Sequence, residues 1–169
     1  IVLFNGLVRK RNEIQNAEGG LDAQLKQRYD LVPNLVSAVK KFMRHETQLL
    51  ENIVNLRNCG LGKDLSQEEK QTINSKLSRE LRSLMVQVEQ YPELRSGQSF
   101  VHLQETLYEI EENIAASRRF FNTAVLIYNN ATETYPSNVV ARLCGFKRRE
   151  VFEIPEIERQ NPDLMKMLG

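Results

Sequence analysis

A single helical seam between Phe100 and Tyr135 constrains the fold of this chain more than any other feature of the sequence. Apolar and small side chains recur along it at intervals of three and four residues, with no proline or glycine between its ends. This spacing places all of them on one side of one α-helix. Such a helix would be about 54 Å long, and ordering its backbone costs roughly 1–2 kcal/mol per residue. Burial returns about 1.5–3 kcal/mol for each large apolar side chain, so the helix requires other helices to pack against.

The rest of the chain contains three further helical patterns. With the seam, the predicted helices cover about residues 5–29, 31–58, 66–91 and 97–135. Asp30 is a plausible N-cap that puts Pro33 in the first turn of the second helix, and Ser66 begins a capping box that opens the third. A short helix follows Pro136. We therefore expect an all-α fold, a long antiparallel up-down four-helix bundle with a short C-terminal helix and a tail.

The corners of such a bundle assign residues to its two ends. The start of the first helix, the 58–65 loop and the end of the fourth helix would share one end, and the corners at residues 28–30 and 91–92 the other. Polar residues at the second end form a candidate partner-binding site: Arg28, Asp30, Asn34 and Tyr91. The alternative is that these four side chains only cap and hydrogen-bond the corners.

Glu46 is the only charge on the apolar face predicted for the second helix. Because an unpaired buried carboxylate costs several kcal/mol, we expect a polar core layer made of Glu46, Ser117 and Arg118. The layer is either structural or a ligand site. His45-Glu46 begins like a zinc motif, but Leu49 occupies the place of its second histidine. The sequence offers no recognisable catalytic, metal or cofactor site.

The chain begins with eight largely apolar residues, Ile1 to Val8, followed at once by Arg9-Lys10-Arg11. Eight residues cannot span a bilayer that needs about 20, so they are either the last turns of a spanning helix or an amphipathic first turn. The corner argument places a second basic and aromatic cluster beside them. The predicted membrane-proximal set is Arg9, Lys10, Arg11, Arg142, Phe146, Lys147, Arg148, Arg149 and Phe152.

Such a cluster suits an anionic membrane surface, although it would also serve as an ordinary solvated face. The chain as a whole carries a formal net charge of +1. This balance argues against nucleic acid as the main partner.

A set of ordered motifs runs along the chain. They are Asn16-Ala17, QLKQRYDLVPNLV at 24–36, His45-Glu46, YPEL at 91–94, Leu103-Gln104, EENI at 111–114, SRRFFNTAV at 117–125, Tyr128-Asn129, YPSN at 135–138, Gly145-Phe146 and Phe152-Glu153. Together these motifs resemble those of the bacterial LemA family. The resemblance covers residues 4–153. It implies an N-terminal membrane helix followed by a helical-bundle domain. Residues 1–4 would be the remnant of that anchor, residues 5–153 the domain, and residues 154–169 a flexible tail.

The first functional hypothesis is a membrane-anchored, non-enzymatic helical module of the bacterial cell envelope that binds an unknown protein partner or acts as a scaffold. It would be a single-pass protein of the cell membrane, and the basic run at residues 9–11 favours the cytoplasmic side. The alternative is a ligand- or metal-handling domain that uses the polar layer around Glu46. A third hypothesis is a scaffold that only deforms or marks membrane through Phe146, Phe152 and the basic cluster.

Overall fold

The computed structural model describes residues 1–152, and this part of the chain is helical, with no strand. Its helices are α1 (Val2–Lys40), α2 (Thr47–Gly60), α3 (Gln67–Val88), α4 (Pro92–Arg95), α5 (Gln98–Glu133) and α6 (Ser137–Leu143). The predicted all-α class is therefore confirmed. The predicted tail at 154–169 lies outside the described residues.

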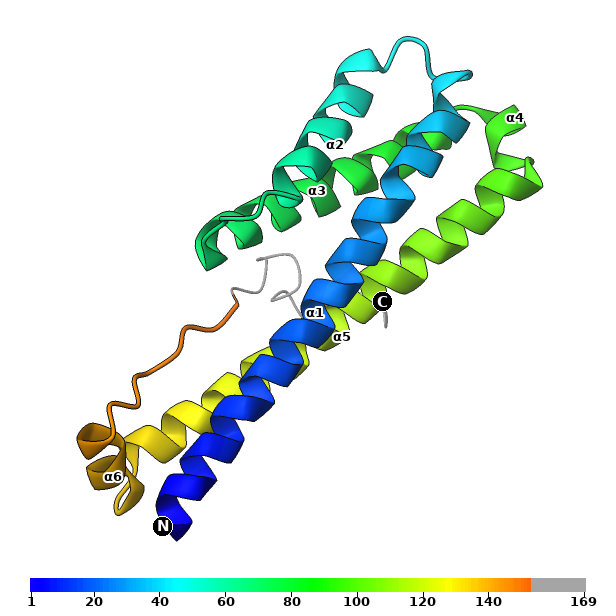
Figure 1. Ribbon diagram of the computed structural model, residues 1–169. Coiled ribbons are helices and arrows are strands. Elements are labelled where there is room, and N and C mark those ends of the chain that lie inside the picture. Colours follow the sequence, from blue (N-terminus) through cyan, green and yellow to red (C-terminus); the bar gives the residue numbers. More distant parts are fainter. Residues whose placement is uncertain (153–169) are drawn as a thin grey trace, which may run out of the picture.

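The two long helices, α1 and α5, run antiparallel along most of the molecule (Figure 1). α5 is 36 residues long and buries most of the predicted seam, including Leu107, Ile114, Phe121 and Tyr128. It ends at Glu133, so the predicted seam residue Tyr135 lies beyond the helix and is exposed. α1 is 39 residues long and buries a matching stripe that includes Leu7, Ile14, Leu21 and Leu35. Each of these long helices thus supplies the apolar surface that the other requires.

The corner predicted at Asp30 is wrong, because α1 continues through Pro33 to Lys40. A proline inside a helix leaves the carbonyl four residues earlier without its donor. Here that carbonyl belongs to Tyr29, and it accepts a hydrogen bond of 3.0 Å from Nε of Arg57 on α2. Val32, Leu35 and Val39 are buried on the same helix. A side chain from another helix and apolar packing therefore stabilise the turn that contains the proline.

The actual corner lies between Lys40 and Thr47, and it leaves α2 only 14 residues long. The loop from α2 to α3 therefore reaches only part of the way along α1, where Gln67 at its end donates a hydrogen bond to Glu18. The predicted capping box at Ser66 is confirmed, since Ser66 Oγ accepts from the backbone N–H of Glu69 at 3.2 Å.

The α2–α3 pair consequently covers α1 and α5 only over the half of the molecule that ends at the 41–46 turn and α4 (Figure 1). We call that end the far end. In the other half, α1 and α5 are accompanied by α6 and the segment that follows it. The predicted placement of the 58–65 loop at the N-terminal end is wrong, and an up-down four-helix bundle along the whole length is not confirmed.

The two ends of the long helices do meet as predicted. The rings of Phe4 and Phe146 lie 5.7 Å apart between centroids in an edge-to-face arrangement. α6 contacts α1 at this end (Figure 1). We call residues 1–13 and 131–150 the base.

Replacing Gly60 with alanine is expected to destabilise the protein. A Cβ at Gly60 would lie 2.5 Å from Cζ of Tyr29, whose buried ring is held by a hydrogen bond to Asn74. Overpacking of this kind costs about 1–3 kcal/mol, which exceeds the gain in helix propensity. The matched control is Gly19→Ala in α1, where a Cβ meets nothing within 4 Å.

We expect this control to raise stability by about 0.5–1 kcal/mol, because alanine is the better helix former. Denaturant unfolding of both variants measures the difference. Equal effects of the two substitutions would show that the contact between Gly60 and Tyr29 does not constrain α2.

Candidate functional site

Arg28 forms the centre of a polar layer inside the molecule. Its side chain is fully buried, and its terminal nitrogens donate to three groups on other helices. The acceptors are Oγ of Ser78 at 2.6 Å, Oε1 of Glu111 at 2.8 Å and Oδ1 of Asn74 at 2.7 Å. Arg28 therefore links α1 to both α3 and α5, and its charge is compensated by the Glu111 carboxylate.

The partners of Arg28 are themselves linked. Ser78 donates to Oε2 of Glu111 at 3.0 Å, and the hydroxyl of Tyr29 donates to Oδ1 of Asn74 at 2.7 Å. Burial raises the pKa of Tyr29 above its ordinary value, and the adjacent positive charge of Arg28 opposes this rise. At neutral pH the phenol is therefore protonated and available as a donor.

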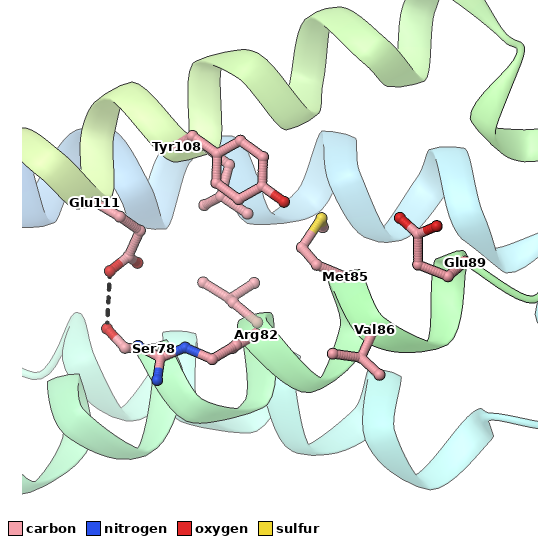
Figure 2. Close-up of a pocket in the computed structure, with 9 residues that line it drawn as sticks. Ser78, Arg82, Met85, Val86, Glu89, Tyr108 and Glu111 are labelled. Atoms are coloured by element: carbon pink, nitrogen blue, oxygen red, sulfur yellow. Dashed lines mark hydrogen bonds between the residues drawn. The ribbon is translucent and has the colours of Figure 1, made fainter. Parts of the chain in front are cut away.

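Beside this layer lies an open groove of about 360 Å³ between α3 and α5. Figure 2 shows Ser78 and Glu111 at one end of the groove, Glu89 at the other, and Met85 between them. Tyr108 and Val86 belong to its walls although 54% and 64% of their surfaces are exposed. The remaining lining residues are Leu81, Arg82 and Leu107.

The four predicted partner-binding residues do not form one surface. Arg28 lies within α1 and is buried in the polar layer, so the prediction that it lies at a corner of the bundle is wrong. Asp30 is exposed on α1 and forms an ion pair of 2.7 Å with Lys26. Asn34 is also exposed on α1, whereas Tyr91 is half-buried at the start of α4. The reason is the continuation of α1 through Pro33, which removes the corner that grouped them.

The polar layer predicted around Glu46 is wrong in its members. Glu46 is part-exposed at the N-cap of α2, and Ser117 and Arg118 are half-buried on α5. The contact between Arg28 and Glu111 fixes the register of α1 against α5. From that level Glu46 lies toward the far end, whereas Arg118 lies toward the base, because the two helices are antiparallel. They cannot belong to one layer.

One signal in the sequence does indicate the real layer. Arg28 falls on the apolar face of its helix, three residues after Leu25, and a buried arginine requires a carboxylate. Glu111 directly follows the seam residue Ile110, so it is a candidate carboxylate to compensate the charge of Arg28. Asn74, Ser78 and Tyr29 could not be chosen without knowing how α3 lies against α1.

The base brings several members of the predicted membrane-proximal set together. The guanidinium of Arg11 lies 5.5 Å from the ring centroid of Phe146, and that ring contacts Phe4. Arg148 forms an ion pair of 3.0 Å with Glu133. Arg9, Arg142, Lys147 and Arg149 are exposed, and Lys10 is half-buried.

Phe152 does not belong to this group. Its ring is buried and lies 5.3 Å from the ring of Phe121, well along α5 from the base, so its predicted place at the membrane is wrong. The chain after Phe146 turns back along α5 (Figure 1). We call residues 146–152 the strap.

Two asparagines of α5 hold the strap. Asn129 donates to the carbonyl of Arg149 at 2.8 Å and accepts from its N–H at 2.9 Å. Asn122 makes the same pair of bonds with Phe152, at 2.8 and 2.7 Å. Seven residues of helix rise about 10.5 Å, and three residues of extended chain span about 10 Å, so the two spacings match.

Residues 1–152 contain no group of three histidine, cysteine, aspartate or glutamate side chains placed to hold a metal ion. A search of the same residues finds no helix whose length and apolar character would let it cross a membrane.

The fold and the site define an all-helical protein built on one long antiparallel pair, with a buried arginine layer and a groove in one half and a basic, apolar base in the other. The chain belongs to the LemA family, whose sequence profile matches residues 17–165. The resemblance inferred from the motifs is thereby confirmed.

Individual relatives agree with this assignment. The protein is 25% identical to Protein LemA of Metamycoplasma hominis over 96% of this chain and 74% of that protein. It is 26% identical to Magnetosome protein MamQ 1 of Paramagnetospirillum magneticum over 90% of this chain. That alignment spans 65% of MamQ 1, a little under two thirds of its length. A shorter match, 39% identical over 41% of this chain, is to Magnetosome protein MamQ of Magnetospirillum gryphiswaldense.

Proposed function

We propose that the protein is a non-enzymatic helical module of the bacterial cell envelope, attached to a membrane at its base and bound to a partner protein through the groove between α3 and α5. The observation that carries the proposal is the composition of this groove. Tyr108, Met85 and Arg82 are of the residue types that are enriched at protein interfaces, and they lie among Leu81 and Leu107.

The groove also has the layout of a recognition surface. Its centre is apolar, and carboxylates lie at its two ends: Glu111, held by Arg28, and Glu89, which forms an ion pair of 2.8 Å with Arg95. A groove with fixed ends and an apolar centre suits the apolar face of a helix or an extended segment. Because the buried layer ties α3 to α5, little reorganisation would be needed on binding.

The base supports the membrane half of the proposal. Exposed apolar side chains, those of Ile1 and Val2 among them, lie at this end of the molecule beside basic residues, which suits attachment to a membrane. The basic residues 9–11 follow within three turns and favour the cytoplasmic side. The alternative of a ligand or metal site around Glu46 loses its basis, because Glu46 lies in a turn apart from Ser117 and Arg118.

Site-specific photo-crosslinking in cells that carry the membrane-attached protein tests the partner-binding half. A photoreactive residue at Tyr108 or at Val86 is expected to give the same adduct. A photoreactive residue at Phe120, which is 63% exposed on α5 outside the groove, is the matched control and is expected to give none.

The substitution Tyr108→Glu should abolish the adduct at Val86, because losing a central interface tyrosine costs about 2 kcal/mol, or roughly thirtyfold in affinity. Thermal unfolding should stay unchanged, since the Tyr108 side chain is exposed and its hydroxyl bonds only Gln104 among the described residues. An adduct at Val86 that persists in Tyr108→Glu, or equal adducts at Phe120, would contradict binding in the groove.

A further inference from the structure

α6 presents an apolar stripe to solvent. Val139 and Leu143 are four residues apart on α6, and 50% and 82% of their surfaces are exposed. Side chains at this spacing share one face of a helix. Tyr135, whose surface is 79% exposed, lies in the turn just before α6. Ala141, on the other side of α6, is buried against the protein. The stripe is therefore directed away from the molecule rather than into its core.

A second set of exposed apolar side chains lies at the same end of the molecule. Residues 1–4 at the start of α1 are exposed, and α6 contacts α1. The Phe4 ring, which is partly exposed, lies against Phe146. Exposed apolar side chains from both ends of the domain therefore lie at the base.

The same end of the molecule is strongly basic. Its cations are Arg9, Lys10, Arg11, Arg142, Lys147, Arg148 and Arg149, and its carboxylates are Glu13, Glu133 and Glu150. The base therefore has a formal charge of +4, whereas the whole chain has +1, so the rest of the chain is acidic on balance. Arg11 and Arg148 are held at this end by Phe146 and Glu133.

We infer that the base binds anionic lipid headgroups directly, with α6 lying in the interface and its stripe entering the acyl boundary. The inference rests on the proposed membrane attachment and names the lipid class that the base contacts. Exposed aliphatic and aromatic side chains flanked by lysine and arginine are the features of an interfacial segment. The excess of cations selects an anionic bilayer, since each basic residue near such a surface adds attraction within about a Debye length of 8 Å.

Vesicle flotation of the purified 169-residue chain tests this inference. We expect the chain to float with vesicles in which phosphatidylglycerol replaces part of the phosphatidylcholine, and to float much less with phosphatidylcholine alone. Raising the ionic strength should release it, because the attraction is electrostatic in part. Equal binding to both kinds of vesicle would overturn the selectivity for anionic lipid.

Variants of α6 separate its contribution from that of residues 1–4. Val139→Ser with Leu143→Ser is expected to lower the vesicle partition coefficient at least about tenfold. The matched control, Phe120→Ser with Leu126→Ser, removes side chains of similar exposure from α5 outside the base and should leave partitioning unchanged.

Charge variants test the headgroup contact. Arg142→Glu with Lys147→Glu should weaken binding to anionic vesicles by more than about tenfold, whereas Lys76→Glu with Arg79→Glu on α3 should leave it nearly unchanged. Unaltered flotation of the α6 and base-charge variants would overturn the inference.

The outcomes separate the inference from the proposed function. Base variants that lose the vesicle binding of the unaltered chain but keep the crosslinks at Tyr108 would support the lipid contact, because a groove-bound partner does not depend on it. A chain that ignores anionic vesicles in the test tube while its groove crosslinks persist would end the lipid inference and leave the groove proposal standing. A dimer in sedimentation experiments that Leu143→Ser disperses would assign the stripe to a second copy and overturn the inference.

Discussion

Replacing Arg28 with methionine is expected to lower the free energy of unfolding by about 3 kcal/mol. Removing one partner of a buried ion pair costs about 3–5 kcal/mol, and the lower value applies because 29% of the Glu111 side chain is exposed and can regain water. Ser78 and Asn74 lose a donor at the same time. For a chain of this length the midpoint of thermal unfolding should fall by about 6–12 °C.

Denaturant unfolding with Lys26→Met as the control measures this effect. Lys26 lies on the same helix, and its ion pair with Asp30 is exposed, so its loss should change stability by less than about 1 kcal/mol. The double variant Arg28→Met with Glu111→Gln should lose less than the sum of the single changes, because the uncompensated carboxylate is removed with its partner. Additive effects, or an unchanged midpoint for Arg28→Met, would show that the layer does not hold α1, α3 and α5 together.

Local sequence signals were sufficient for α5 and for the start of α3. The seam of α5 and the capping box at Ser66 depend only on residues within the same helix, and both are present in the structure. The path through Pro33 was not predictable in this way. The donor that satisfies Tyr29 comes from Arg57, which is 28 residues away and lies on another helix. A residue that disfavours a helix, such as Pro33, can be compensated by a side chain from another helix. No pattern within α1 indicates that such compensation exists.

That one misplaced corner explains most errors about the candidate site. With a helix break at Asp30, Arg28 became a corner residue and Glu46 became the middle of a helix. The structure reverses these two roles, because α1 continues to Lys40 and the turn falls at residues 41–46. The basic cluster was less sensitive to the error. Arg11 and Phe146 lie together where the ends of α1 and α5 meet, and the corner argument had placed these two ends side by side.

The position of Phe152 could not be predicted from a periodic pattern. The strap has no helical or strand periodicity of its own, so the path of the chain after Gly145 does not follow from the sequence. The direction is set by the two amides of Asn122 and Asn129, which bind the backbone of Phe152 and Arg149. In sequence these asparagines are two polar residues near a helical seam. Their role follows only from the structure, where their spacing on the helix matches the spacing of two residues in an extended chain.

Replacing Asn129 with alanine is expected to release the strap while α5 remains intact. Asn129 is buried, and its loss leaves both the N–H and the carbonyl of Arg149 without their partner. Each of these two hydrogen bonds contributes about 0.5–1.5 kcal/mol, so the free energy of opening the strap should fall by about 1–3 kcal/mol. Amide hydrogen exchange at Arg149 should therefore accelerate by roughly 5–150-fold.

Asn122→Ala should likewise accelerate amide hydrogen exchange at Phe152. The acceleration should be smaller if the contact between the rings of Phe152 and Phe121 still holds the end of the strap. Asn130→Ala is the control, because Asn130 is exposed next to Asn129 and should change exchange little. Equal exchange at Arg149 in Asn129→Ala and Asn130→Ala would show that other contacts, such as the ring packing of Phe152 and the hydrogen bond from Tyr128 to the carbonyl of Lys147, hold the strap without the amide of Asn129. Faster exchange confined to the Asn129 variant would show that the polar face of α5 fixes the path by which the chain leaves the base.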